Sequence, residues 1–144
     1  MIAVVDSGVA NLRSVSNALN HLGAQYHIAH TSDDLAGADK IILPGVGAFA
    51  AGMDQLRRRG FVRPLRRLAA QGVPVLGICL GMQLLFECSE EMGSHEGLGL
   101  LKGKIVRFPV SQQQIVIVEL DLEGNEISTA GSFLLRVEGA VQFL

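Results

Sequence analysis

Hydrophobic positions in the first 92 residues follow two different periods. Continuous apolar runs rich in β-branched residues predict strands at residues 2–6, 24–30, 39–44 and 73–78. Apolar residues spaced three and four apart predict helices at residues 10–23, 32–38 (with Ser32 as N-cap), 48–60, 61–72 and 80–91. Because strands and helices alternate and the strands carry no polar face, the pattern predicts a parallel sheet covered on both faces.

This order of elements predicts an α/β fold of the flavodoxin-like type, a doubly wound and mostly parallel sheet with right-handed crossovers. The pattern changes after residue 92. Residues 97–110 predict a glycine-rich loop and a strand, and residues 113–128 and 132–144 predict further strands with no helix between them. We therefore expect a single domain over residues 1–144, with a β-rich tail at its C-terminal end.

Composition and charge narrow the function classes. The chain has 144 residues, of which 49% are apolar and 18% charged, and this composition excludes a disordered protein. The formal net charge of −2 gives no overall basic field that would attract nucleic acid. Residues 57–67 are locally basic, but their arginines recur at helical spacing among leucines, which favours a solvated helix face over a nucleic-acid site.

The number of cysteines and the absence of long apolar runs indicate in which cellular compartment the protein is located. The two cysteines, Cys79 and Cys88, are too few for a disulfide framework. Asp6 and Asn11 interrupt any apolar core of a signal peptide, and no run approaches the roughly 20 apolar residues needed to span a bilayer. We expect a cytoplasmic protein with reduced thiols, no metal ion and no cofactor.

The chemistry-bearing feature is Cys79 in the stretch GICLGMQLL, at the junction of a predicted strand and helix. Ligands of open parallel sheets bind at the carboxyl ends of strands, where this cysteine lies. Glycine stands two positions to either side, as a sharp strand-to-helix turn that exposes a nucleophile requires. Such a turn frees the amide of Leu80 to donate to an oxyanion. We interpret Cys79 as a nucleophile and Cys88, which lacks this setting, as structural.

A second glycine-rich strand end lies at residues 44–52. It contains G-x-G-x-x-A, formed by Gly45, Gly47 and Ala50, so a dinucleotide-binding turn has to be considered. Against that interpretation, Pro44 precedes the turn and the next strand ends in Gly77 rather than in an acidic residue. Backbone amides that face Cys79 and form an oxyanion hole suit the segment better.

Four stretches together resemble one family. GICLGMQLL, LPGVGAF, DSGVANLRSV and GLGLLKGKIVRF are similar to segments of the glutaminase subunits of imidazole glycerol phosphate synthase, a group of class I glutamine amidotransferases. The resemblance covers residues 1–108, whereas residues 109–144 form a divergent tail in which the family's C-terminal segment is absent. It implies a glutaminase of histidine biosynthesis that passes ammonia to a (β/α)₈-barrel cyclase, which makes imidazole glycerol phosphate and AICAR.

The resemblance also implies roles for individual residues. Cys79 matches the nucleophile that forms a glutamyl thioester, and Leu80 and Val46 match residues whose amides form the oxyanion hole. The remaining matches concern binding. They are Gly45, Gly47, Gln83 and Glu91 for the glutamine, and Asn11, Arg13 and Ser14 within residues 10–15 for the cyclase partner.

The chain departs from the family at the catalytic base, the group that would activate Cys79. The family carries a catalytic histidine and a glutamate near its C-terminus, and no histidine follows His95 in this chain. None of His21, His27, His30 and His95 stands at the family's base position, so we expect impaired activity. Three alternatives stay open: a non-catalytic module that docks on the cyclase, a bare flavodoxin-like scaffold, and a peptidase-like or chaperone-like cysteine enzyme.

Overall fold

The computed structural model describes residues 1–106, 116–120 and 126–132. They belong to two compact units, Met1–Ile105 and Val106–Leu144. No helix in the described part of the chain is both long and apolar enough to cross a membrane.

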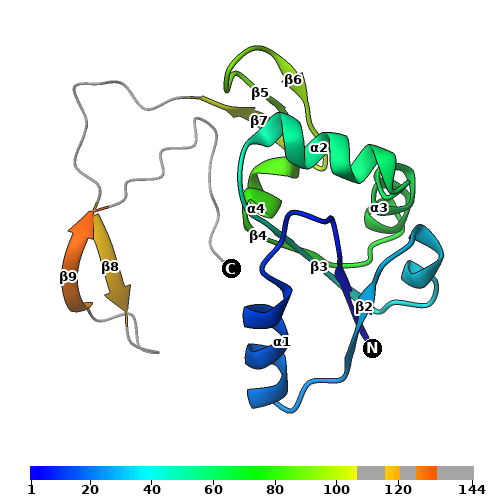
Figure 1. The fold of residues 1–144 in the computed structure, drawn as a ribbon, viewed down its shortest axis with the longest axis horizontal. Helices are drawn as coiled ribbons and strands as arrows, with labels where there is room; N and C mark the ends of the chain where they lie inside the picture. The colour runs from blue at the N-terminus through cyan, green and yellow to red at the C-terminus, as the bar shows by residue number, and fades with distance from the viewer. Residues whose placement is uncertain (107–115, 121–125, 133–144) are drawn as a thin grey trace. The chain divides into compact units, whose positions relative to one another are not determined.

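The first unit is built on a four-stranded sheet (Figure 1). Its strands are β1 (Ile2–Val5), β2 (Tyr26–Ala29), β3 (Lys40–Gly45) and β4 (Val75–Cys79), and all neighbours pair in parallel. Their order is β2-β1-β3-β4. This order confirms the predicted flavodoxin-like arrangement, because sequential strands are placed on both sides of β1.

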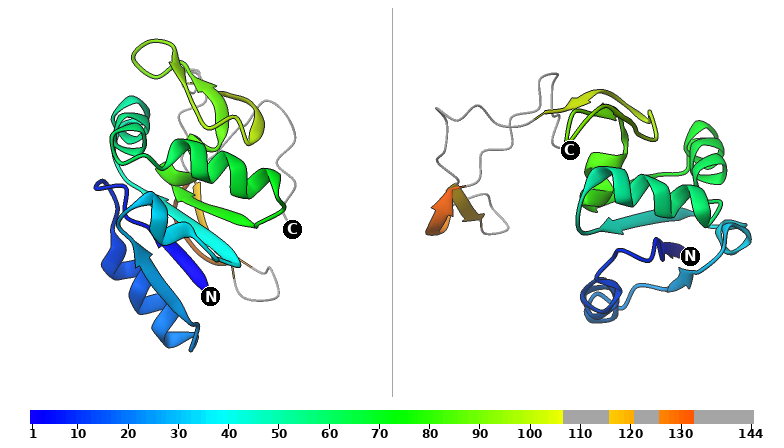
Figure 2. Two further views of the ribbon diagram at one scale, coloured as in Figure 1. Left: turned by 90° about the vertical axis from the view of Figure 1, so that its right-hand side faces the viewer. Right: turned by 45° about the horizontal axis from the view of Figure 1, so that its top comes forward.

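Helices cover both faces of this sheet, as the right-hand view of Figure 2 shows. Helix α1 (Leu12–His21) packs on one face. Helices α2 (Phe49–Arg58), α3 (Val62–Ala70) and α4 (Leu80–Leu84) pack on the other. Apart from residues 32–38, the predicted helices and strands are therefore confirmed in type up to residue 84.

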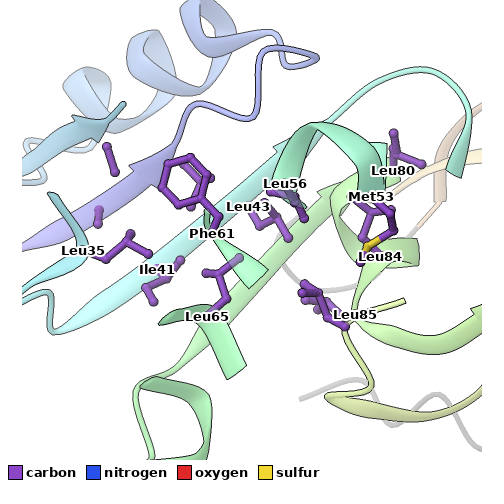
Figure 3. Packing of buried hydrophobic residues seen from close by; sticks show 14 of the residues in the cluster. Leu35, Ile41, Leu43, Met53, Leu56, Phe61, Leu65, Leu80, Leu84 and Leu85 are labelled. Carbon is purple, nitrogen blue, oxygen red and sulfur yellow. The ribbon is translucent and has the colours of Figure 1, made fainter. Parts of the chain in front are cut away.

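The larger core lies between the sheet and helices α2, α3 and α4 (Figure 3). Leu43 of β3, Leu56 of α2 and Leu65 of α3 meet there with no exposed surface. Each fully buried leucine stabilises the fold by about 2 kcal/mol relative to an exposed one. Leu80 and Leu84 of α4 belong to the same cluster, so the helix that follows Cys79 is anchored in the core.

Two predicted helices differ from the structure. Residues 32–38 form only a 3-10 turn, Ser32–Leu35, and its N-cap is Thr31 rather than Ser32. The Asp34 carboxylate accepts hydrogen bonds from the Thr31 amide at 2.8 Å and the His30 amide at 2.9 Å. These bonds close the turn one residue earlier than the sequence pattern predicts, and they hold the pKa of Asp34 below its usual value.

The prediction of one helix over residues 80–91 is wrong in its second half. Helix α4 ends at Leu84, and Phe86–Ser89 form strand β5, which contains Cys88. Strand β5 pairs with β7 (Leu101–Ile105) in parallel and with β6 (His95–Glu96) in antiparallel fashion. Because this pairing uses the backbone of residues 86–89, the helix cannot continue.

The second unit contains strands β8 (Val116–Leu120) and β9 (Glu126–Ser132), which pair in antiparallel fashion. They lie within the region that the sequence predicts to be β-rich. The rest of the predicted tail, residues 107–115, 121–125 and 133–144, lies outside the described residues.

One face of strand β4 is uncovered among the described residues. Leu76 is 57% exposed and Ile78 39% exposed, although β4 reads as a buried strand. Both pair with β3 residues on the face that α1 covers further along the sheet, Leu76 with Ile42 and Ile78 with Pro44. β4 is also the last strand of the four-stranded sheet. Parallel sheets normally have both faces buried, so this patch favours association.

We expect Leu76→Lys to reduce self-association of the chain, because it places a charge on this apolar face. Light scattering during size-exclusion chromatography, over a range of protein concentrations, measures the effect. The matched control is Leu22→Lys, since Leu22 is 75% exposed at the end of α1, away from β4. A loss of more than about 2 kcal/mol of unfolding free energy in Leu76→Lys alone would contradict the prediction, because it would mean that Leu76 is buried in solution.

Candidate active site

Cys79 occupies a strained turn between β4 and α4. Its backbone angles are φ 55° and ψ −120°, a conformation that side-chain-bearing residues rarely adopt. Holding a residue there costs about 1–3 kcal/mol and persists only where the surrounding structure enforces it. The Cys79 side chain is exposed, and no hydrogen-bond partner of its sulfur lies among the described residues. The turn therefore holds the thiol at the surface, where a substrate can reach it.

The glycines on both sides of Cys79 are required by close backbone contacts. A Cβ on Gly77 would lie 2.4 Å from Cα of Met82, and a Cβ on Gly81 would lie 1.8 Å from the carbonyl oxygen of Leu43. Neither contact is sterically possible. The predicted reason for the G-x-C-x-G spacing, collision of larger side chains with backbone, is therefore confirmed.

The end of strand β3 lies directly beside this turn. Gly45 is the register partner of Cys79, and a Cβ on Gly45 would lie 2.8 Å from the Gly81 amide nitrogen. Gly47 follows with φ +98°, a value that favours glycine. The structure thus brings together the two glycine-rich segments that the sequence analysis singled out.

The two predicted oxyanion-hole amides differ in availability. Leu80 begins α4, and the first N–H groups of a helix have no partner within the helix. The Val46 amide, in contrast, donates a hydrogen bond of 2.7 Å to the carbonyl oxygen of Val9. In this conformation Val46 is therefore not free to bind an oxyanion, and the peptide between Gly45 and Val46 would have to turn before it could.

Gln83 and Glu91, the residues predicted to hold glutamine, lie on separate elements. Gln83 is half-buried on α4, one turn after Cys79. Glu91 follows β5, and its carboxylate accepts a hydrogen bond of 2.8 Å from the Phe49 amide at the start of α2. A carboxylate at a helix N-terminus is favourable, so Glu91 also fixes the segment that joins Gly47 to α2.

The predicted partner residues lie at the start of α1, which follows the carboxyl end of β1. Asn11, Arg13 and Ser14 are all exposed. The Asn11 side chain accepts a hydrogen bond from the Ser14 amide at 3.2 Å and thereby caps α1. Among the described residues, the side chains of Arg13 and Ser14 make no hydrogen bond and are available for contact with a partner. Because all strands run parallel, these residues share the carboxyl rim of the sheet with Cys79.

No histidine in the described part of the chain contacts Cys79. His30 pairs with Asp6 at 3.0 Å, and Arg59 approaches the same carboxylate at 3.3 Å. Burial alone would raise the pKa of Asp6, but the hydrogen bonds from Gly8 and His30 and the charge of Arg59 together lower it. His27 bonds the Asp34 carbonyl oxygen instead. The prediction that none of these histidines is the base is consistent with the contacts that they make.

Within residues 1–106, where side chains are described, no group of three or more histidine, cysteine, aspartate or glutamate residues could hold a metal ion.

Part of the basic stretch at residues 57–67 has a structural role that its helical spacing does not reveal. Arg63 and Arg67 are exposed, as a solvated face predicts. Arg59 ties the end of α2 to Asp6, and Arg66 bonds the backbone that precedes β7. Spacing identifies the helix face but not the distant segment that each side chain reaches.

Comparison with known proteins agrees with this geometry. The profile of the family described as Glutamine amidotransferase class-I matches residues 3–129. The chain belongs to this family. A solved structure titled "Crystal structure of glutamine amidotransferase" superposes with a TM-score of 0.68 at 22% identity, over 83% of this chain and 63% of that one, and supports the fold.

Several relatives are named Imidazole glycerol phosphate synthase subunit HisH. The protein of Sulfurimonas denitrificans is 54% identical over 112 residues, which is 78% of this chain and 54% of that protein. The protein of Lactiplantibacillus plantarum is 41% identical over 143 residues, which is 99% of this chain and 68% of that protein. Similarity to the latter therefore extends past residue 108. The chain spans about half the length of the first of these relatives.

The close contact at Gly81 generates a stability prediction. We expect Gly81→Ala to lower the unfolding free energy by about 3 kcal/mol or more, because the new methyl group collides with the Leu43 carbonyl. Gly23→Ala is the control: its Cβ would contact nothing within 4 Å, and only the φ of +64° is unfavourable. That strain costs about 1–2 kcal/mol. Equal losses in chemical denaturation of the two variants would contradict the close contact.

Proposed function

We propose that this chain carries the nucleophile of a glutaminase that supplies ammonia for imidazole glycerol phosphate synthesis in histidine biosynthesis. The observation that supports this best is Cys79, an exposed thiol at a positive φ, enforced by two glycines that cannot bear a side chain. The relatives named as subunits of imidazole glycerol phosphate synthase support the pathway. A cytoplasmic location is part of the same proposal.

The proposed reaction has two steps. The Cys79 thiolate attacks the carboxamide carbon of glutamine, and the resulting oxyanion is stabilised by backbone amides at the start of α4. As the C–N bond breaks, the leaving nitrogen takes up the proton that the thiol has lost and departs as ammonia, and a glutamyl thioester remains. Water then hydrolyses the thioester to glutamate and restores the thiol. Gln83 and Glu91 are the residues that we propose orient the glutamine.

Two features of the structure lower the proposed activity of the chain on its own. The first is that no base contacts Cys79 among the described residues, so none of these residues assists proton transfer to the leaving nitrogen. General acid–base catalysis of this kind contributes about 10²–10⁴-fold. The second is that the Val46 amide donates its hydrogen bond to the carbonyl oxygen of Val9 and so does not stabilise an oxyanion beside the thiol.

The nucleophile is tested by labelling. We expect a glutamine-analogue chloroketone to modify Cys79 and not Cys88, because only Cys79 lies in the strained turn. Peptide mass mapping measures the two sites in one sample, and Cys79→Ala and Cys88→Ala form a matched pair. Ammonia release from glutamine should be about 100-fold or more below that of the full-length Sulfurimonas denitrificans relative. Equal labelling of both cysteines would refute the assignment, and rapid turnover that depends on Cys79 would reveal a base.

We propose that the partner is a (β/α)₈-barrel cyclase that docks on the rim near Arg13. Arg13 is exposed at the start of α1, on the rim that also presents Cys79. In calorimetric titrations against the cyclase, Arg13→Glu should weaken binding. Arg63→Glu, an equal charge reversal on exposed α3, should leave it unchanged. If the two variants bind alike, the interface lies elsewhere. If the unmodified chain does not bind, both the partner and the alternative of a non-catalytic docking module are removed.

A further inference from the structure

Helix α4 depends on a distant segment for its C-terminal end. It has five residues, too few for a helix that is stable by itself. Residues 97–101, called here the GLGLL segment, donate amide hydrogen bonds to the last carbonyl of this helix and to the carbonyls of the two residues that follow it. The bonds are Leu98 to Leu84 at 2.8 Å, Gly99 to Phe86 at 3.0 Å, and Leu100 and Leu101 to Leu85 at 2.8 and 2.9 Å.

The GLGLL segment runs very close to the backbone that it caps. A Cβ on Gly97 would lie 2.2 Å from the carbonyl oxygen of Phe86 and 3.0 Å from the ring of Phe49. Leu98 is almost fully buried and belongs to the same core cluster as Leu80 and Leu84. Any displacement of the segment therefore removes the hydrogen bonds that end α4 and disturbs the packing beneath it.

Arg66 of α3 holds the GLGLL segment in place. Its guanidinium donates from Nε to the Leu98 carbonyl at 2.9 Å, and from one terminal nitrogen to the Gly97 carbonyl at 3.0 Å and to the Glu96 carboxylate at 2.8 Å. A hollow of about 500 Å³ opens beside these contacts, lined by Arg66 itself, two alanines of α3 and residues 98–100 of the segment. On this open side of the segment, the polar contacts of Arg66 add to the anchoring that the buried Leu98 provides.

A second arginine supports the same attachment. Arg57 of α2 donates to the backbone carbonyl of Glu96 at 3.0 Å. The hydrogen bond from Arg66 and then its charge keep the pKa of the Glu96 carboxyl below its usual value. Glu96 thus remains ionised, and its attraction to Arg66 persists, at any pH above the normal glutamate range.

We propose that Arg66 is a positioning residue for Cys79: through the GLGLL segment it fixes the end of α4, and α4 fixes the strained turn that presents the thiol. The inference rests on the proposed role of Cys79 as the nucleophile. Arg66 itself does not contact the reacting atoms.

The positioning is tested with three variants of the full chain. Arg66→Met keeps an unbranched apolar stem and removes the donors, whereas Arg66→Lys keeps the charge and one donor group. Arg67→Met is the matched control, because Arg67 is the exposed neighbour on the same helix and its side chain makes no hydrogen bond or ion pair among the described residues. All measurements are made well below the melting temperature of each variant, and Arg66→Lys decides the question if Arg66→Met does not fold.

The first measurement is hydrogen exchange of peptides that cover residues 97–101 and 80–86. In Arg66→Met we expect both to exchange about fivefold faster, the effect of losing roughly one net hydrogen bond to a charged group at a half-exposed site. Arg66→Lys should lie between Arg66→Met and the unmodified chain, and Arg67→Met should be unchanged. Unchanged exchange at residues 97–101, or faster exchange there without any change at 80–86, would overturn the proposal.

The second measurement is the modification rate of Cys79, with Cys88 read in the same sample. We expect the ratio of the rate with a glutamine-analogue chloroketone to the rate with iodoacetamide to fall about fivefold at Cys79 in Arg66→Met, because only the former reagent needs the positioned turn. A purely structural Arg66 would lower the melting temperature and leave this ratio unchanged, which would overturn the proposal. If the unmodified chain does not react with the chloroketone, the proposed function fails, and the exchange data alone then decide whether Arg66 holds α4.

Discussion

The contact between the backbone of α4 and the end of β3 is the constraint on which the candidate site depends. At Gly81 the two segments approach so closely that a single methyl group would overlap the Leu43 carbonyl. Gly45 and Gly77 permit the same approach from either side. Because the helix cannot move away without losing the burial of Leu80 and Leu84, the chain turns sharply at Cys79 and retains its positive φ. Packing of α4 in the core thus keeps Cys79 in its strained backbone conformation.

The turn at Cys79 is also supported from the C-terminal end of α4. A five-residue helix has little cooperativity of its own, so its last carbonyls need partners from elsewhere in the chain. The GLGLL segment provides them. Arg66 of α3 holds that segment, and Arg57 of α2 holds Glu96 just before it. Residues as far as Leu101, 22 positions after Cys79 in sequence, therefore decide how the thiol is presented. A site built in this way keeps its nucleophile geometry although no base contacts Cys79 among the described residues.

Much of the first unit could be predicted from the sequence because its signals are local. Apolar runs and helical spacing predicted β1 to β4 and α1 to α3, since each element buries one stripe of its own residues. The helix over residues 80–91 was predicted too long because FECS reads equally well as helix or strand over so short a span. Pairing with β7, more than ten residues away, decides between them. No local pattern carries that information.

The sequence by itself determined the parallel sheet, the position of Cys79 at a strand end and the glycines around it, because periodicity and steric exclusion act over a few residues. Only the tertiary structure decided which polar groups meet. It directs the Val46 amide to Val9, places the Glu91 carboxylate on the first amide of α2, and turns Arg66 from a solvated arginine into a support of the GLGLL segment. Hydrogen bonds between distant segments depend on how the elements pack, and packing is a property of the whole unit.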